Sequence, residues 1–278
     1  MRFKKHLIKI RQRKFFYWEK NKKAEEAVIF IHGFPGNHSG LVEFAGCFGK
    51  NHRMIIPDLP ACGRSETLAG SHTLENYAGW LNDFMNSLQL KQAVIVGHSF
   101  GARVAFMFSA GYHKRVKKLV LVTPVVNKNS LVPLLGSLQY KILKILPRRF
   151  QKEWLNNKVY QKSCHAIMFK SASPARIKLI TKRDRKEYSC LLPAVAIEVF
   201  NDFENLDLFS VAEEIAVPTL VIAGGKDEIA APKSVQRLAE KIRPAEFRVM
   251  EDSGHLAPLE SPRRTAGLIL NWLAKNNF

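Results

Sequence analysis

Short runs of apolar residues alternate along most of the chain with segments in which apolar residues recur every three or four positions. Continuous runs are typical of parallel strands buried on both faces, and the periodic segments are typical of helices that bury one face. The strand-type runs lie at 27–31, 53–57, 118–123, 218–224 and 245–250, and the helix-type segments lie at 74–88, 232–243 and 262–275, while a strand, a turn and a helix share 93–110. This alternation predicts an α/β fold around a mostly parallel sheet.

Two strand-type segments near the N-terminus, 7–10 and 14–18, flank a polar turn. Their spacing predicts an antiparallel hairpin with basic residues on its solvent face. Lys and Arg on such an edge strand hinder pairing with another chain.

Between residue 126 and about residue 188 the strand-type runs stop and only helix-type segments remain. Pro147 and Pro174 interrupt this region. Its apolar stripe consists of Leu131, Leu134, Leu135, Leu138, Ile142, Leu143 and Leu146. The simplest organisation is a sheet domain in two parts, 1–126 and 189–278, interrupted by a helical cap insertion at 127–188.

Positive charge is concentrated in two segments of the chain, whose 278 residues carry a formal net charge of +19. Residues 1–23 hold ten Lys or Arg and one acid, and residues 128–187 hold fifteen against three. The rest of the chain has a net charge of −2, so the helical insertion is itself strongly basic. Nucleic acid is disfavoured as the partner, because no helix-turn-helix, zinc or RNA-binding motif accompanies the charge.

Targeting signals and metal motifs are absent from the sequence. Charged residues interrupt the start of the chain, so it has no apolar stretch of signal-peptide length. No run of about 18 apolar residues predicts a transmembrane helix. The four cysteines lack a spacing such as Cys-x-x-Cys, and they indicate thiols in a reducing compartment. We therefore expect a cytoplasmic protein that uses no metal and no cofactor.

The candidate chemistry begins at 94–105, where an apolar run leads into Gly97-His98-Ser99-Phe100-Gly101 and then into a helix of small residues. A Gly-x-Ser-x-Gly turn between strand and helix is typical of a nucleophile elbow, whose strained backbone exposes the serine hydroxyl above the sheet edge. The helix N-terminus favours negative charge that develops near this serine. A glycine-rich turn of a nucleotide-binding unit is the alternative interpretation.

Several motifs in order make the chain resemble the α/β-hydrolase superfamily, of the type with a helical cap. They are His32-Gly33, the loop 58–65, the elbow, the segment 217–227 and Asp252-Ser253-Gly254-His255. Ala61 departs from the glycine that the family usually carries in the loop after its third strand. The resemblance covers nearly the whole chain and implies a catalytic triad beneath the cap.

Ser99, Asp227 and His255 follow the Ser…Asp…His order of that fold. A serine hydroxyl needs an imidazole to take its proton and a carboxylate to orient the imidazole. Asp227 follows a buried strand and His255 follows the next one, so both are expected at the carboxyl ends of the strands, where ligands bind in such sheets. Glu228 is the alternative acid.

An oxyanion hole of this family takes two backbone amides. The matching residues here are Phe100, directly after the nucleophile, and Phe34, in the loop after the first buried strand. His32 and Asp58 are expected to order their own loops. His98 is expected to pack beside the pocket.

Serine as the nucleophile implies acyl chemistry, whereas related haloalkane dehalogenases and most epoxide hydrolases use aspartate. We expect a serine hydrolase that cleaves a carboxylic ester or thioester through an acyl-enzyme. The alternatives are a hydrolase of carbon–carbon bonds in diketones, a cofactor-free perhydrolase, and a non-catalytic scaffold whose basic cap binds an acidic partner.

The cap of such folds roofs the pocket and selects the small-molecule acyl substrate. Its basic residues form either a solvated surface or a docking face. The candidate partners of a docking face are an acidic acyl carrier, an anionic membrane surface and an anionic substrate.

Overall fold

Eight strands of the described chain form one sheet in the order β1-β2-β4-β3-β5-β6-β7-β8. The computed structural model describes residues 2–126, 138 and 140–276. The strands are β1 Lys4–Ile10, β2 Arg13–Lys20, β3 Glu26–Ile31, β4 His52–Pro57, β5 Ala93–His98, β6 Val116–Val122, β7 Thr219–Gly224 and β8 Ala245–Met250. β2 runs antiparallel to both β1 and β4, and all other neighbouring strands are parallel. The expected α/β fold with an N-terminal hairpin is confirmed.

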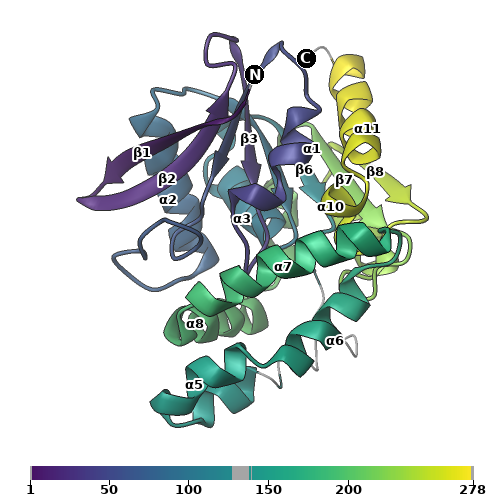
Figure 1. The fold of residues 1–278 in the computed structure, drawn as a ribbon. Coiled ribbons are helices and arrows are strands. Elements are labelled where there is room, and N and C mark those ends of the chain that lie inside the picture. Colours follow the sequence, from purple (N-terminus) through teal and green to yellow (C-terminus); the bar gives the residue numbers. More distant parts are fainter. Residues whose placement is uncertain (1, 127–137, 139, 277–278) are drawn as a thin grey trace.

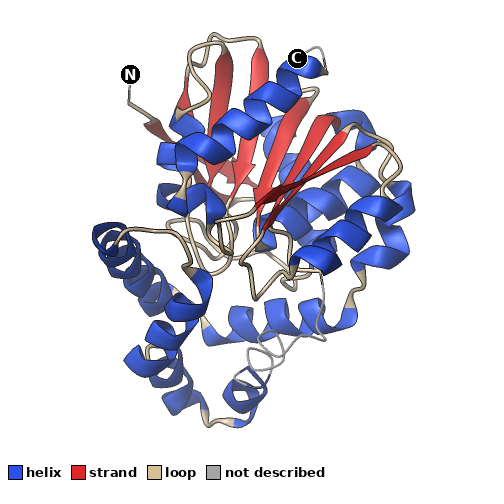
Figure 2. Cartoon of the chain, turned by 90° about the vertical axis from the view of Figure 1, so that its right-hand side faces the viewer, coloured by secondary structure: helices blue, strands red, loops and turns tan. Residues whose placement is uncertain are grey.

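Helices cover both faces of this sheet, because alternate side chains of its central strands point to opposite sides (Figure 2). In β3, Ile29 and Ile31 belong to one apolar cluster, whereas Val28 and Phe30 belong to the other. The first cluster is completed by α2 Leu74–Ser87, α3 Phe100–Gly111, α9 Pro232–Lys241 and the 3-10 helix η3 Leu208–Glu214, and the second by α1 Val42–Gly46, α10 Ala257–Glu260 and α11 Pro262–Lys275. Two further 3-10 turns are η1 His38–Gly40 and η2 His113–Arg115.

The described part of the chain between β6 and β7 contains no strand, and its helices before η3 form one group. They are α5 Arg148–Leu155, α6 Lys158–Met168, α7 Pro174–Cys190 and α8 Pro193–Asn205, preceded by helical residues 140–145. Figure 1 shows this group below the sheet, with α5 at the lower end of the molecule. Leu131, Leu134 and Leu135 of the expected apolar stripe lie outside the described residues. None of the helices that are described is long and apolar enough to cross a membrane.

These helices have a small buried cluster of their own, formed by Tyr140, Leu143, Leu155, Leu191 and Ala196. Helix α7 continues through residue 188, where the sequence analysis ends the insertion, and α8 adds a further helix before β7. The division of the chain at 127–188 stays a prediction.

Arg103 ties together the two chain segments that join these helices to the sheet. Its side chain is buried on α3, and it donates to the carbonyl of Val125 at 2.9 Å and to that of Leu206 at 3.3 Å. Burial lowers the pKa of Arg103 to about 10, so the guanidinium keeps its charge at neutral pH. Because Val125 follows β6 and Leu206 follows α8, one buried cation holds both ends of the helical group.

Candidate active site

Ser99 occupies the turn between β5 and α3 in a strained backbone conformation. Its φ of 55° lies in the left-handed region, which residues with a side chain rarely adopt. The two flanking positions require glycine because no side chain would fit there. A Cβ on Gly97 would clash with the carbonyl oxygen of Gly101, and a Cβ on Gly101 would clash with that of Ile31. The turn therefore has the geometry expected of a nucleophile elbow.

Ser99, His255 and Asp227 form a continuous chain of hydrogen bonds. The Ser99 hydroxyl donates to Nε2 of His255 at 2.8 Å, and Nδ1–H of His255 donates to Oδ2 of Asp227 at 2.9 Å. The other carboxylate oxygen accepts from the amides of Ile229 and Ala230 at 2.8 and 2.9 Å. The imidazole and carboxylate are 3% and 0% exposed, so water competes little for these bonds. The structure thus brings the three expected residues together.

The neighbouring acid, Glu228, faces a different direction. Its carboxylate pairs with Lys170 at 2.8 Å, and its side chain is 55% exposed. Of the two acids at this turn, Asp227 is the one that meets the imidazole.

The backbone of His255 is held from two sides. His98 Nε2–H and Thr123 Oγ1–H both donate to the His255 carbonyl, at 3.0 and 2.9 Å. Burial and the neighbouring His255 lower the pKa of His98 to about 3, so His98 is neutral in the folded protein. The sequence predicts only a packing role for His98 and does not single out Thr123. The available signal was a polar residue at the end of the apolar run 118–123.

The expected oxyanion donors lie beside Ser99. The first amides that bond within α3 are those of Ala102 and Arg103, which both donate to the Ser99 carbonyl, so the Phe100 amide precedes them at the helix N-terminus. The loop that holds Phe34 also approaches, since a Cβ on Gly33 would lie 3.3 Å from Cβ of Ser99. Donation by both amides to one substrate oxygen stays a prediction.

His32 orders this loop in the way the sequence analysis expected. Its Nδ1–H donates to the Gly33 carbonyl at 2.8 Å, and its Nε2 accepts from the Leu59 amide at 3.0 Å. Acceptance at Nε2 requires the neutral imidazole, and burial lowers the pKa of His32 accordingly. The histidine therefore connects the loop after β3 to the loop after β4.

Asp58 and Ala61 shape the second of these loops. The Asp58 carboxylate accepts from the amides of His38 and Arg64 at 2.9 and 3.0 Å, so it bonds its own loop and the loop after β3. Ala61, where the family usually has glycine, adopts a φ of 64°. That left-handed conformation explains the family's glycine and costs an alanine about 1 kcal/mol.

Glu260 connects the histidine loop to the helical group, although the sequence does not single it out. One carboxylate oxygen accepts from the Gly254 amide at 3.1 Å and from the Ser171 hydroxyl at 2.8 Å. The other accepts from the Lys170 amide at 2.7 Å. The available signal was one acid within the apolar stretch that follows His255.

A cavity of about 80 Å³ adjoins Ser99 and His255, with room for a reacting carbonyl group. His165 and Met168 of α6 and Arg183 of α7 line it together with the loop after β3. Arg183 also donates to the Ser39 carbonyl at 3.0 Å. Two helices between β6 and β7 therefore form part of the wall around the nucleophile.

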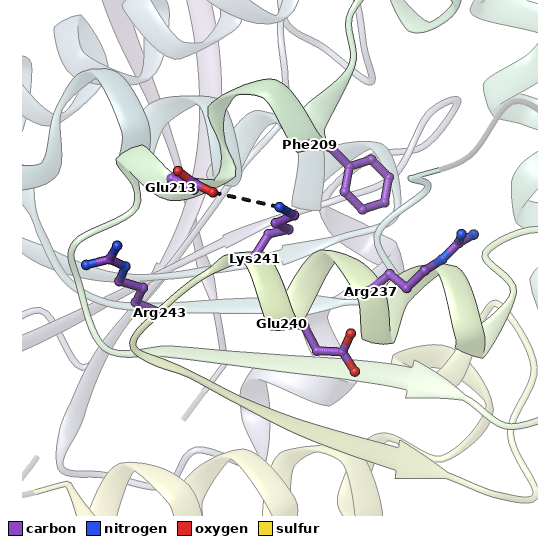
Figure 3. A pocket seen from close by; sticks show the side chains of 6 residues that line it. All are labelled: Phe209, Glu213, Arg237, Glu240, Lys241 and Arg243. Carbon is purple, nitrogen blue, oxygen red and sulfur yellow. Dashed lines mark ion pairs between the residues drawn. The ribbon is translucent and has the colours of Figure 1, made fainter.

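A second hollow, of about 440 Å³, lies between η3 and α9 and contains none of these residues (Figure 3). Its lining is Phe209, Glu213, Arg237, Glu240, Lys241 and Arg243. Glu213 and Lys241 pair across it at 3.8 Å. No serine, cysteine or histidine lines it, so it offers no nucleophile for acyl chemistry.

Comparisons with known proteins agree with the fold described above. Lipase 1 of Psychrobacter immobilis is 27% identical over 256 residues, which cover 91% of this chain and 78% of that one. A monoacylglycerol lipase of Homo sapiens is 24% identical, covering 89% of this chain and 75% of that one. The solved structure of an esterase from Thermogutta terrifontis superposes with a TM-score of 0.76 at 24% identity, covering 99% of both chains. The family model described as the alpha/beta hydrolase fold matches residues 26–262, and the chain belongs to that family.

Proposed function

We propose that this protein is a serine hydrolase of the esterase and lipase type, which cleaves a carboxylic ester or thioester through an acyl-enzyme on Ser99. The hydrogen-bonded chain from Ser99 through His255 to Asp227 carries the proposal. The lipase and esterase names of the relatives support ester bonds as the target.

The reaction follows from the positions of the donors and acceptors. Nε2 of His255 takes the hydroxyl proton of Ser99 while Oγ bonds to the acyl carbon and the carbonyl electron pair moves to its oxygen. The amides of Phe34 and Phe100 donate to that oxyanion. The imidazolium, stabilised by Asp227, then protonates the leaving alcohol or thiol as its bond to carbon breaks. Water repeats the sequence on the acyl-enzyme and releases the acid.

The test is active-site labelling with a fluorophosphonate, together with turnover of a p-nitrophenyl ester. Ser99→Ala should abolish labelling, and Ser99→Ala or His255→Ala should lower turnover by about 10³-fold or more. Asp227→Asn should lower it somewhat less. Glu228→Gln is the matched control, because it removes the adjacent acid that does not meet the imidazole, and it should stay near wild type.

Three outcomes would replace parts of this proposal. A wild-type protein that neither reacts with the probe nor turns over any ester would favour the scaffold interpretation. A labelled protein that cleaves a vinylogous diketone but no ester would identify a carbon–carbon bond hydrolase. If Glu228→Gln lowered turnover strongly and Asp227→Asn lowered it little, Glu228 would be the catalytic acid and Asp227 would not.

We also propose that the basic segment 128–187 meets an anionic partner in the cytoplasm, either an acidic acyl carrier or an anionic membrane surface. Its net charge of +12 supports this assignment. With a carrier-bound or vesicle-presented substrate, kcat/KM should fall steeply between about 50 and 300 mM salt, because the attraction is screened. Turnover of a small neutral ester should change little. Equal salt responses would identify the charge as a solvated surface.

A further inference from the structure

Large apolar side chains are exposed mainly on the helical group between β6 and β7. Among the described residues, the exposed large apolar side chains are Leu7, Leu138, Ile145, Phe150, Leu179 and Leu192. Five of these six lie in the chain segment between β6 and β7, and Ile145, at 81%, is the most exposed. Scattered single residues of this kind are ordinary on a protein surface, but five of them within one segment of the chain call for an explanation.

Two of them lie at the end of the molecule farthest from the sheet, in a segment that we call the cap tip, residues 141–152. This segment comprises the helical residues 141–145, a bend at Pro147 and the first part of α5, which Figure 1 shows at the lower end of the molecule. It contains five cations and no acid. The cations are Lys141, Lys144, Arg148, Arg149 and Lys152, all exposed. Glu153 directly follows the segment, and of these five cations only Lys141 lies within ion-pairing distance of an acid among the described residues, Glu204 at 3.4 Å.

The exposure of Ile145 and Phe150 does not come from a loose loop. The side-chain amide of Gln151 donates to the carbonyls of Leu143 and Leu146, both at 3.1 Å, and so closes the end of the helix before the bend. The Phe150 amide donates to the Pro147 carbonyl at 2.9 Å. The bend is therefore a turn fixed by hydrogen bonds, and it presents its apolar residues to solvent.

The opposite side of the tip is anchored. Leu143 and Leu155 are buried in the small cluster of the helical group, on the inner side of the same two helices. The guanidinium of Arg149 lies 4.8 Å from the ring centre of Phe150, so a cation and an apolar side chain project together. The tip is thus amphipathic, with an inner face that holds it in place and an outer face of aliphatic, aromatic and cationic groups.

We propose that the cap tip docks this protein on an anionic lipid bilayer. Ile145 and Phe150 enter the boundary between headgroups and acyl chains, and the surrounding cations contact lipid phosphates. This assignment rests on the proposed function, because it brings an acyl hydrolase to the surface where acyl lipids lie.

The shape of the tip favours a bilayer over an acidic protein. A stable protein interface buries about 800 Å² on each partner, around an apolar centre and a paired rim. The tip instead offers two projecting apolar side chains among cations on a narrow end of the molecule. A soft, anionic lipid surface can surround such a projection without a complementary partner shape.

The experiment measures binding without turnover. Full-length protein is sedimented with phosphatidylcholine vesicles, with and without phosphatidylglycerol. We expect binding only to the anionic vesicles, and about tenfold weaker binding after Ile145→Ser with Phe150→Ser. Arg148→Gln with Arg149→Gln should weaken binding and reduce its salt dependence. Hydrolysis of a small neutral ester should be unchanged in all of these variants, since the substitutions lie on the exposed outer face.

The matched control is Leu7→Ser with Lys9→Gln on β1, another place where an exposed large apolar residue lies among cations. This variant should bind vesicles as the wild type does. Loss of binding in the control but not in the tip variants would overturn the proposal, as would equal binding to neutral and anionic vesicles. Polyglutamate serves as a model of an acidic protein. If the protein bound it as tightly as it binds vesicles, and the two apolar substitutions left that affinity unchanged, the partner would be an acidic protein instead. Because vesicle binding needs no catalysis, an inactive Ser99 leaves this test intact.

Discussion

At the scale of single residues, the position of the His255 imidazole is determined by bonds to both its ring and its backbone. Asp227 accepts from Nδ1–H of the ring, and His98 and Thr123 donate to the carbonyl of the same residue. A ring held in this way stays within reach of the Ser99 hydroxyl. Such pre-organisation removes an entropy cost from the attack.

The neutral state of His98 predicts a loss of stability in acid. The unfolded chain binds a proton on this residue below its ordinary pKa of about 6.5, whereas the folded protein, with a pKa of about 3, does not. Between these values the unfolded state binds more protons, so the free energy of unfolding falls as the pH falls. His98→Gln keeps an N–H donor for the His255 carbonyl and removes the titration. The variant should lose less stability than the wild type between pH 7 and about pH 4.5 in urea unfolding.

His113 provides the control for this measurement. It is exposed in η2, so His113→Gln should leave the pH dependence as it is in the wild type. If the His98→Gln protein lost stability in acid as steeply as the wild type, groups other than His98 would determine the pH dependence of the free energy of unfolding.

At the scale of elements, helix α3 links the nucleophile to the helical group. Ser99 directly precedes its first residue, and Arg103, one turn later, holds both segments where the helices leave and rejoin the sheet domain. Phe203 of α8 adds a ring 4.7 Å from the guanidinium. Any displacement of the helical group is therefore opposed by the same helix that positions the serine.

Arg103→Met should test this link. It leaves the Val125 and Leu206 carbonyls without their donor and should lower the free energy of unfolding by about 2–4 kcal/mol. Arg103→Lys keeps the charge but lacks the planar guanidinium that can donate to both carbonyls. It should therefore lower the free energy of unfolding by an intermediate amount. Because the helices also line the cavity, both variants should raise KM for longer acyl esters more than they lower kcat. Urea unfolding and ester kinetics measure these effects, and a Met variant as stable as the wild type would refute the link.

At the scale of the whole molecule, stability is distributed unevenly. The helical group has a buried cluster of five residues, whereas the two clusters around the sheet contain most of the other buried apolar side chains of the described chain. Local opening requires less free energy where fewer apolar contacts are lost. Native-state hydrogen exchange should therefore find the amides of α5 and α6 opening at lower free energy than those of β3 and β5. Equal opening energies would mean that the molecule unfolds as one unit.

Much of this architecture could be predicted from the sequence, because central strands buried on both faces appear as unbroken apolar runs. The short helices α1 and α10 could not, since five and four residues are too few to display a helical period. The sequence predicts Asp227 with Glu228 as the alternative. Because adjacent turn residues point in different directions, only the folded backbone shows that Asp227 faces the imidazole. The partners of Arg103 and Glu260 were equally hidden, lying up to 103 and 90 positions away in the chain.

Phe34 has a consequence for protein engineering. Its side chain packs against both the cluster on the α2 and α3 face of the sheet and the cluster of the helical group, while its amide is the proposed oxyanion donor. Exchanging the helical group for that of a relative, in order to change which acyl chains are accepted, would also exchange part of the surface on which Phe34 rests. Such a chimera would inherit an altered turnover rate along with its new selectivity. Libraries of exchanged caps should therefore vary residue 34 together with the cap.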